Sequence, residues 1–380
     1  MKIPIKFNKI GVGAKAIDEA NMPLTFKATA PSTVKLNATG SPTTSGLQYR
    51  LGTSGGWSPY VIGTEISLDT DKEVQFQNTE TTLSLNNNNY VKFVMTGTIE
   101  ASGNIQSMLN YSESVNSCCY QNLFNGCTSL TKAPELPVTD LTNATYCYAR
   151  MFYMCTSLTK APTLPATTLA NYCYNNMFQM CYMLTEAPEL PATTLAANCY
   201  ANMFQNCQSL TEAPELPATS LDKYCYQYMF AGCSSLSNVK VGFTEWNTNY
   251  TNLWLNNVSS TGTFTKLTAL PEEFGSGKIP EGWTVVNSDA VEEPTGKIVG
   301  YVITNAGTTN VNGTYDHWDG NTWKDMFGNM LVPNLPSTGQ WGLYDAGWGL
   351  MYHTTGSDVT SNWVVDSGQL PVPTVTIMYE

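Results

Sequence analysis

The sequence has few charged residues for its length. Asp, Glu, Lys and Arg make up 13% of its 380 residues, about half of the ~25% that is usual in soluble domains. Asn, Thr, Ser, Gly and Tyr take their place, which is typical of externally exposed, β-rich proteins. The net charge is −12, and Lys and Arg form no cluster. We therefore expect no nucleic-acid partner and no docking on anionic lipid.

Long hydrophobic runs are also missing. No segment reaches the ~18 apolar residues that a membrane helix needs, so we expect no membrane insertion. The N-terminal segment MKIPIKFNKIGVGAKAIDEAN has no apolar core or small-residue cleavage site, so we expect that it is not a signal peptide. If Met1 is the native start, the general secretion route is excluded; the alternative is a trimmed chain with an added Met.

Recognisable catalytic motifs are lacking. The only two histidines are His317 and His353, which rules out Cys/His or Ser/His sites elsewhere, and no phosphate-loop, zinc-protease or nucleophile-elbow motif occurs. Asp316, His317 and Asp319 fit a surface turn, with a metal site as the alternative. We expect no enzyme, no cofactor and no metal.

Cysteine, by contrast, recurs at fixed intervals in the middle of the chain. The first spacing in each of two columns is 28 residues and the next three are 26. A fixed period of this length marks a stacked-repeat architecture, which usually binds rather than catalyses. The columns are Cys119, Cys147, Cys173, Cys199 and Cys225, and Cys127, Cys155, Cys181, Cys207 and Cys233.

Each repeat divides into two parts. The segment APELP, as in 187–191, predicts a short extended stretch, because Pro interrupts ladder hydrogen bonding. The run from Thr193 to Cys207 lacks Pro and Gly and predicts a helix. In the preceding unit its apolar face comprises Leu169, Cys173, Met177 and Cys181, spaced four apart, and Thr167 or Thr168 would cap it.

The cysteines themselves are predicted to be buried thiols. Within a helix, Cys173 and Cys181 would lie about 12 Å apart along the axis, too far for a disulfide, and no Cys-x-x-Cys zinc spacing occurs. Cysteine is a small, readily buried residue. Cys118 lies outside both columns, and we expect it alone to be accessible.

The remaining segments predict a mainly β, multidomain fold around a central α/β solenoid. Residues 1–22 are an anchor arm, 23–105 an Ig-like β domain, 106–242 the repeats, 243–287 their C-terminal cap, 288–296 a linker and 297–380 a β-rich aromatic module. In the Ig-like domain, turn-separated β-prone runs predict strands at Leu24–Lys27, Thr33–Leu36, Leu47–Leu51, Glu73–Phe76 and Tyr90–Met95.

The repeats resemble the BspA-like leucine-rich repeats of bacterial surface proteins. The resemblance rests on Cys-x-x-Leu units such as Cys127–Leu130, Cys155–Leu158, Cys181–Leu184, Cys207–Leu210 and Cys233–Leu236. Leu253–Val286 is similar to the tail that closes such arrays, and the module around Val302–Tyr315 to modules appended to phage fibres. The resemblance implies adhesion or recognition at a cell surface and carries no catalytic residues.

Aromatic side chains are the candidate ligand-binding groups, since stacked rings can bind sugar faces. A column of Tyr, broken by Asn198, lies at the edge of the apolar stripe; the alternative is that these rings pack between units. The last module holds five of the nine Trp, some of them core and one or two a ligand platform. The candidates are Tyr146, Tyr172 and Tyr224, and Trp318, Trp323, Trp341, Trp348, Tyr352 and Trp363.

These features favour a phage virion protein, such as a head or tail fibre or a decoration protein. It would be made in the host cytoplasm, attach to other virion proteins through residues 1–22, form a homo-oligomer and bind host-surface glycan or protein with avidity. The recognition surface is expected in the last module. The alternative is a bacterial cell-surface adhesin that lacks its signal peptide.

Overall fold

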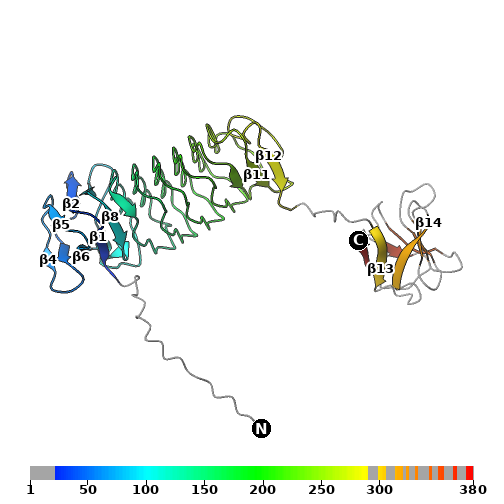
Figure 1. Ribbon diagram of the computed structural model, residues 1–380, viewed down its shortest axis with the longest axis horizontal. Coiled ribbons are helices and arrows are strands. Elements are labelled where there is room, and N and C mark those ends of the chain that lie inside the picture. The colour runs from blue at the N-terminus through cyan, green and yellow to red at the C-terminus, as the bar shows by residue number, and fades with distance from the viewer. Residues whose placement is uncertain are drawn as a thin grey trace, which may run out of the picture. The chain divides into compact units, whose positions relative to one another are not determined.

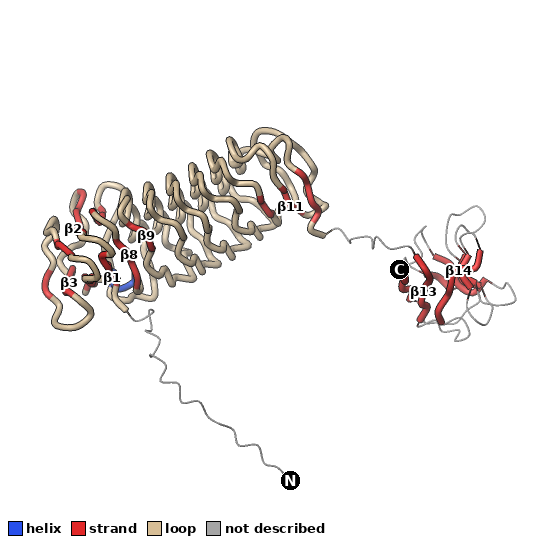
Figure 2. Tube along the Cα trace, viewed as in Figure 1, coloured by secondary structure: helices blue, strands red, loops and turns tan. Residues whose placement is uncertain are grey.

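The computed structural model describes residues 22–289 and the strands between residues 298 and 379. The chain divides into two compact units, 1–290 and 291–380, which we describe separately. Both consist mainly of β-strands and turns, and the described residues contain hardly any helix (Figures 1 and 2). The predicted anchor arm and linker lie outside the described residues, apart from Met22, Ser288 and Asp289.

The first unit begins with two antiparallel sheets. Three strands follow the order β5-β2-β7, and six follow β4-β3-β6-β1-β8-β9, in which β9 joins β8 in parallel. Phe26 of one sheet packs edge-on against Phe93 of the other, with ring centroids 4.8 Å apart. The elements are β1 (Leu24–Ala28), β2 (Ser32–Thr39), β3 (Leu47–Leu51), β4 (Ser58–Pro59), β5 (Ile66–Leu68), β6 (Glu73–Asn78), β7 (Tyr90–Thr96), β8 (Ile99–Ser102), the 3-10 helix η2 (Ile105–Leu109) and β9 (Leu130–Lys132).

All five strands predicted between residues 24 and 95 are confirmed, as β1, β2, β3, β6 and β7. Along β2, Val34 and Leu36 are buried while Thr33 and Lys35 are partly exposed, which is the period-two pattern of a half-buried strand. The short strands β4, β5 and β8 were not predicted, because two to four residues carry too little alternation.

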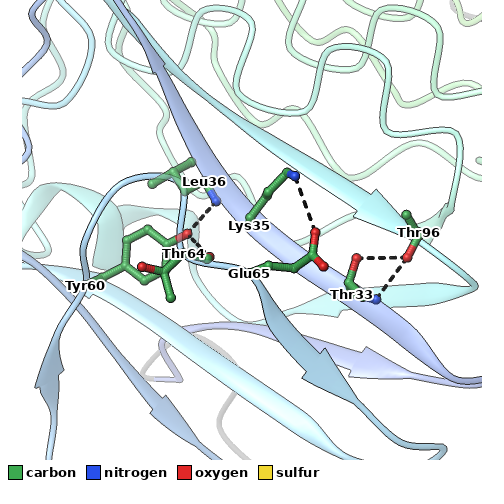
Figure 3. A network of polar contacts seen from close by, with 7 residues as sticks. All are labelled: Thr33, Lys35, Leu36, Tyr60, Thr64, Glu65 and Thr96. Carbon is green, nitrogen blue, oxygen red and sulfur yellow. Dashed lines mark hydrogen bonds and ion pairs between the residues drawn. The ribbon is translucent and has the colours of Figure 1, made fainter.

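Polar side-chain contacts join the central strand β2 to β7 and to the loop before β5 (Figure 3). The buried Tyr60 hydroxyl accepts from the Leu36 amide at 2.8 Å and donates to the Thr64 carbonyl at 2.6 Å. This pair of bonds ties the loop before β5 to β2, and burial raises the pKa of the Tyr60 phenol. Lys35 pairs with Glu65 at 3.3 Å, and the Thr33 and Thr96 hydroxyls lie 2.9 Å apart.

The predicted helix of each repeat is wrong. In Tyr172–Cys181, alternate amides bond in two different ways, and neither is the helical bond to the residue four back. The Met177 amide donates three residues back, to the Tyr174 carbonyl at 3.1 Å, whereas the Phe178 amide donates to Met203 of the next repeat at 2.9 Å. The segment is therefore a chain of tight turns that hydrogen-bonds to its neighbours. Thr168 caps no helix; its hydroxyl donates to Asp140 of the preceding repeat at 2.5 Å.

These turns repeat every four residues. Tyr172, Asn176 and Met180 all have φ between 58 and 62°, the left-handed region, and the following residues return to ordinary conformations. Successive repeats lie side by side in a row (Figure 1), and parallel bridges such as Lys160↔Glu186 and Glu212↔Asn238 join their extended parts. The period-four pattern of the sequence thus reflects turns and not helical faces.

The core of this row is built from columns of identical side chains. Phe124, Phe152, Phe178, Phe204 and Phe230 stack with centroids 5.4–5.6 Å apart. A second column, Tyr120, Tyr148, Tyr174, Tyr200 and Tyr226, stacks at 5.5–6.2 Å. All these rings are buried, and the columns continue the core of the two sheets, because Phe93 stacks on Phe124 at 5.5 Å.

The predicted cap region adds two more parallel strands to the end of the row of repeats. The strands β10 (Asn238–Lys240), β11 (Thr263–Lys266) and β12 (Thr284–Asn287) form a parallel sheet in that order. Trp254 is fully buried and stacks on Tyr226 at 6.2 Å, so indole replaces phenol at the end of the buried core stack of Tyr120 to Tyr226. The cap role of 243–287 stays a prediction.

The second unit contains one antiparallel sheet of eight strands, in the order β19-β18-β17-β16-β15-β14-β13-β20. Its strands are β13 (Ile298–Thr304), β14 (Gly313–Asp319), β15 (Thr322–Lys324), β16 (Met330–Val332), β17 (Gly342–Tyr344), β18 (Leu350–Thr354), β19 (Trp363–Val365) and β20 (Thr374–Tyr379). Across the part of the chain that is described, we find no helix long and apolar enough to span a bilayer.

Candidate binding surfaces

The three candidate Tyr of the repeats occupy one column at the start of the turn segments. Tyr146, Tyr172 and Tyr224 have φ of 60, 60 and 57°, and Asn198 stands at the same position with φ 56°. All four side chains are half-buried. Left-handed backbone is easy for Asn and uncommon for a bulky aromatic residue. We call these four residues the Tyr column.

Two of the Tyr rings lie flat against each other. The Tyr146 and Tyr172 centroids are 4.5 Å apart with an interplanar angle of 13°, so one face of each ring is covered by the other ring. Partial burial, together with the neighbouring Tyr172, raises the pKa of Tyr146. Tyr224 is separated from this pair by the unit of Asn198, and the Lys223 ammonium lies 5.3 Å from its ring centroid. The column thus offers aromatic edges and outer faces instead of a row of open rings.

Polar side chains lie on later turns of the same segments. Asn176, Gln179 and Gln205 form a chain of side-chain amide hydrogen bonds across two repeats, and all are half-buried. Amide groups carry both donors and acceptors, which matches the hydroxyl groups of sugars. The turn surface therefore combines ring edges with neutral hydrogen-bonding groups.

A second surface feature lies over the Ala-Pro-x-Leu-Pro segments. Two adjoining hollows with volumes of about 510 and 420 Å³ share Ala187, Pro188, Glu189 and Pro191. We call this surface the proline groove; its remaining walls come from the preceding segment, 160–165, and the following one, 214–217. The Leu of each segment, such as Leu190 and Leu216, points into the core and is buried.

All eleven cysteines are free and buried, so the two predicted columns are confirmed. The prediction for Cys118 is wrong, because this side chain is only 7% exposed. Burial raises the pKa of the Cys173 and Cys181 thiols to about 12, which keeps them protonated and unreactive. Among the described residues, no group of three His, Cys, Asp or Glu is placed to hold a metal ion.

The candidate residues of the second unit are placed only by backbone position. Trp318, Trp323, Tyr352 and Trp363 lie on β14, β15, β18 and β19, and the pairing puts Tyr352 opposite Leu343, whose side chain is buried. Trp341 and Trp348 lie outside the described residues. Asp316, His317 and Asp319 lie on β14, so the turn predicted for them is wrong; the alternative metal site stays a prediction.

Sequence reasoning missed the proline groove, although the repeated APELP and APTLP segments were its signal. It also missed the left-handed backbone of the Tyr column, which the Asn at the equivalent position 198 would have indicated. Comparison of the chain with protein-family models, with curated protein sequences and with solved structures found no match.

Proposed function

We propose that this protein is a non-enzymatic recognition protein whose repeats form a solenoid of turns that displays the Tyr column to a host-surface glycan. The observation that carries the proposal is the choice of Tyr at left-handed positions. Asn stands at the same position in one repeat and suits that backbone better, so the fold does not require Tyr there. Other bulky residues, such as Met154 and Met180, share this backbone on neighbouring turns, and what distinguishes the Tyr positions is the half-buried, stacked rings that they place on the surface.

The chemistry of the surface fits a neutral sugar better than a charged ligand. Sugar rings present C–H faces that pack on aromatic side chains, and hydroxyl groups that pair with amides. Arg150 is the only Arg or Lys on the turns around Tyr146 and Tyr172. Binding at each site would be weak, and several copies on one particle would supply avidity.

The setting we propose is a phage virion, in which the chain serves as a fibre or decoration protein attached to other virion proteins through residues 1–22. The resemblance to BspA-like repeats and to fibre-appended modules supports this setting. Mass spectrometry of purified particles tests it. Detection of the protein on bacterial cells but not in particles would favour the alternative, a bacterial surface adhesin.

Replacing Tyr172 and Tyr224 by Asn tests the binding surface itself. We expect the double variant to lose at least tenfold in affinity for host cells or their purified glycan. Its free energy of unfolding should change by about 1 kcal/mol or less, because Asn relieves the backbone while the lost Tyr146–Tyr172 stack costs ~0.5–1.5 kcal/mol. Titration on immobilised glycan and chemical denaturation measure the two effects.

The matched control is Tyr182→Asn. This Tyr is 38% exposed and lies outside the Tyr column, so its loss should leave binding unchanged. Wild-type binding should also survive ~0.5 M salt, since ring and amide contacts are screened little. Full affinity in the double variant, or loss of wild-type binding at moderate salt, would remove the Tyr column from consideration.

The aromatic residues of the second unit remain a proposed second surface. A chain that ends before residue 297 separates the two sites. If the shortened chain still binds and then loses binding with Tyr172→Asn, recognition belongs to the Tyr column. If shortening alone abolishes binding, recognition belongs to the second unit.

A further inference from the structure

The proline groove is mainly apolar, and its charged lining residues are Glu186, Glu189, Glu215 and one cation, Lys160, which pairs with Glu186. Pro188, Pro191, Pro214 and Pro217 are half of the residues that line the larger of the two hollows, and proline has no amide hydrogen to offer a ligand. The prolines therefore leave few backbone donors along the groove, which favours an occupant that binds mainly through its side chains. The exposed Glu189 and Glu215 stand at the rim.

Acidic residues follow one another across neighbouring repeats on this face. The sequence TEAPELP occurs twice, at 185–191 and 211–217, which places Glu186 beside Glu212 and Glu189 beside Glu215 in successive units. Lys160 pairs with Glu186 at 2.5 Å and Lys240 with Glu215 at 3.1 Å. No ion pair joins Glu189 or Glu212 to a Lys or Arg among the described residues. Like charges on adjacent strands repel, so a cationic occupant would stabilise this face.

The N-terminal segment of the same chain has matching chemistry. Its first fifteen residues contain four Lys and no acidic residue, although the whole chain has net charge −12. In an extended chain, alternate residues point to opposite sides. Ile3, Ile5 and Phe7 would then share one side, with Lys2 and Lys6 on the other.

The described residues also begin on the face of the repeats that carries the proline groove. Pro23 bridges in parallel to Asn104, and Asn104 bridges to Glu135, which is the residue of the first APELP segment equivalent to Glu189 and Glu215. The start of β1 therefore lies in line with the rim of the groove. Five steps of ~4.8 Å between neighbouring strands put Glu215 about 25 Å from Pro23. Twenty-one extended residues span up to ~70 Å, so the segment has ample reach.

From these observations we infer that residues 1–21 dock in the proline groove of their own chain, with apolar side chains against the prolines and Lys against Glu189 in the groove and Glu212 beside it. Docking within one chain is favoured over docking between chains, because a short tether gives an effective concentration in the millimolar range. An arm held in this way is protected from proteases and from other binding partners until an assembly partner, or another strong competitor, displaces it.

Carbodiimide cross-linking of the full-length protein tests the inference, because it joins only Lys and Glu side chains that are already in contact. Peptide mapping should find Lys2, Lys6, Lys9 or Lys15 joined to Glu189 or Glu212. A mixture of isotopically light and heavy protein at low micromolar concentration should give light–light and heavy–heavy pairs only. Light–heavy pairs would overturn docking within one chain, and no arm-to-groove pair at all would overturn the inference entirely.

Two variants sharpen the test. Glu189→Lys with Glu212→Lys should lower the arm-to-groove cross-link yield at the remaining carboxylates of the groove at least tenfold, and should make the arm more sensitive to a non-specific protease. Glu80→Lys, at an exposed position in the loop after β6, is the matched control and should change neither readout. An arm equally protected in all three proteins would contradict the inference. Should the double variant fail to fold, the cross-links of the wild-type protein decide.

The cross-linking result does not depend on whether the Tyr column binds glycan. The Tyr172 and Tyr224 substitutions lie on the turn surface and leave the groove intact, so they should not alter the cross-links. Likewise, loss of arm docking should not change the affinity of the Tyr column for glycan.

Discussion

Cysteine recurs in these repeats because its side chain does two things at a buried position. It is small enough to fit between stacked units, and its thiol can donate a weak hydrogen bond. The Cys181 thiol lies 3.1 Å from the Phe152 carbonyl of the preceding repeat, and the Cys207 thiol lies 3.1 Å from the Phe178 carbonyl. The same bond occurs at Cys127, Cys155 and Cys233. The second Cys column thus adds a hydrogen bond between neighbouring repeats, at a Phe carbonyl that also accepts a backbone amide.

Thiol labelling of the native protein checks this role. We expect no cysteine to react rapidly, Cys118 included, because all eleven are buried and thiolate formation is suppressed. Labelling in denaturant should recover eleven thiols. Rapid modification of Cys173, Cys199 or Cys225 in the native protein would contradict the buried columns.

Met177→Asp should destabilise the protein by several kcal/mol. Met177 is fully buried, and Asp would place an unpaired charge in the core. Met183, in the same repeat, is 55% exposed, so Met183→Asp should change the free energy of unfolding by no more than ~0.5 kcal/mol. Urea titration of the two variants measures the difference, and equal effects would place Met177 outside the core.

At the scale of the element, the four-residue spacing of buried side chains explains why the sequence wrongly predicts a helix in each repeat. An α-helix turns 100° per residue, so steps of four drift by about 40° each, and Leu169 and Cys181 would lie about 120° apart. The strict spacing was therefore a poorer match to a helix than it seemed. Tight turns keep a period of four indefinitely, which is why buried positions were predicted correctly while the backbone was not.

Circular dichroism and one substitution check the turns. The far-ultraviolet spectrum should lack the double minimum of α-helix, whereas helices of fifteen residues in every repeat would give a strong one. Asn202 has φ 57°, so Asn202→Val should cost about 1–2 kcal/mol and Asn202→Gly very little. If Val were tolerated as well as Gly in thermal melts, the left-handed turn would be wrong.

At the scale of the whole molecule, one buried cluster runs from Leu24 in β1 to Trp283 beside β12. The sequence indicated only the part of this cluster that lies in the repeats, through its columns of Cys, since identical residues at a fixed period must stack on themselves. It did not indicate that β9 would extend the first sheet into the repeats, because that pairing joins Ile99 to Leu130 across thirty residues without a local signal. The Tyr column and the proline groove likewise depend on contacts between repeats.

This continuous core should make the protein sensitive to alkaline pH. Burial raises the pKa of Cys127, Cys173, Cys181, Cys225 and Cys233 from 9.0 to about 12. Below pH 9 these thiols are protonated in both states, and the stability that they contribute is fully present. Between pH 9 and 12 the unfolded chain releases protons that the native state retains, so stability falls as pH rises.

Each such thiol should contribute a slope of about 1.4 kcal/mol per pH unit in that window. Melting temperatures should therefore be flat from pH 7 to 8.5 and fall steeply above pH 9. Burial also raises the pKa of core Tyr such as Tyr148 and Tyr174 well above its usual value, so Tyr contributes to the same loss of stability. The contribution of the thiols is isolated by comparison with the Cys173→Ala/Cys181→Ala variant. Its stability should be lower at neutral pH because of the cavities left behind, but it should fall less steeply with pH. An unchanged slope would mean that these two thiols titrate alike in the folded and unfolded chain, and that they are not buried.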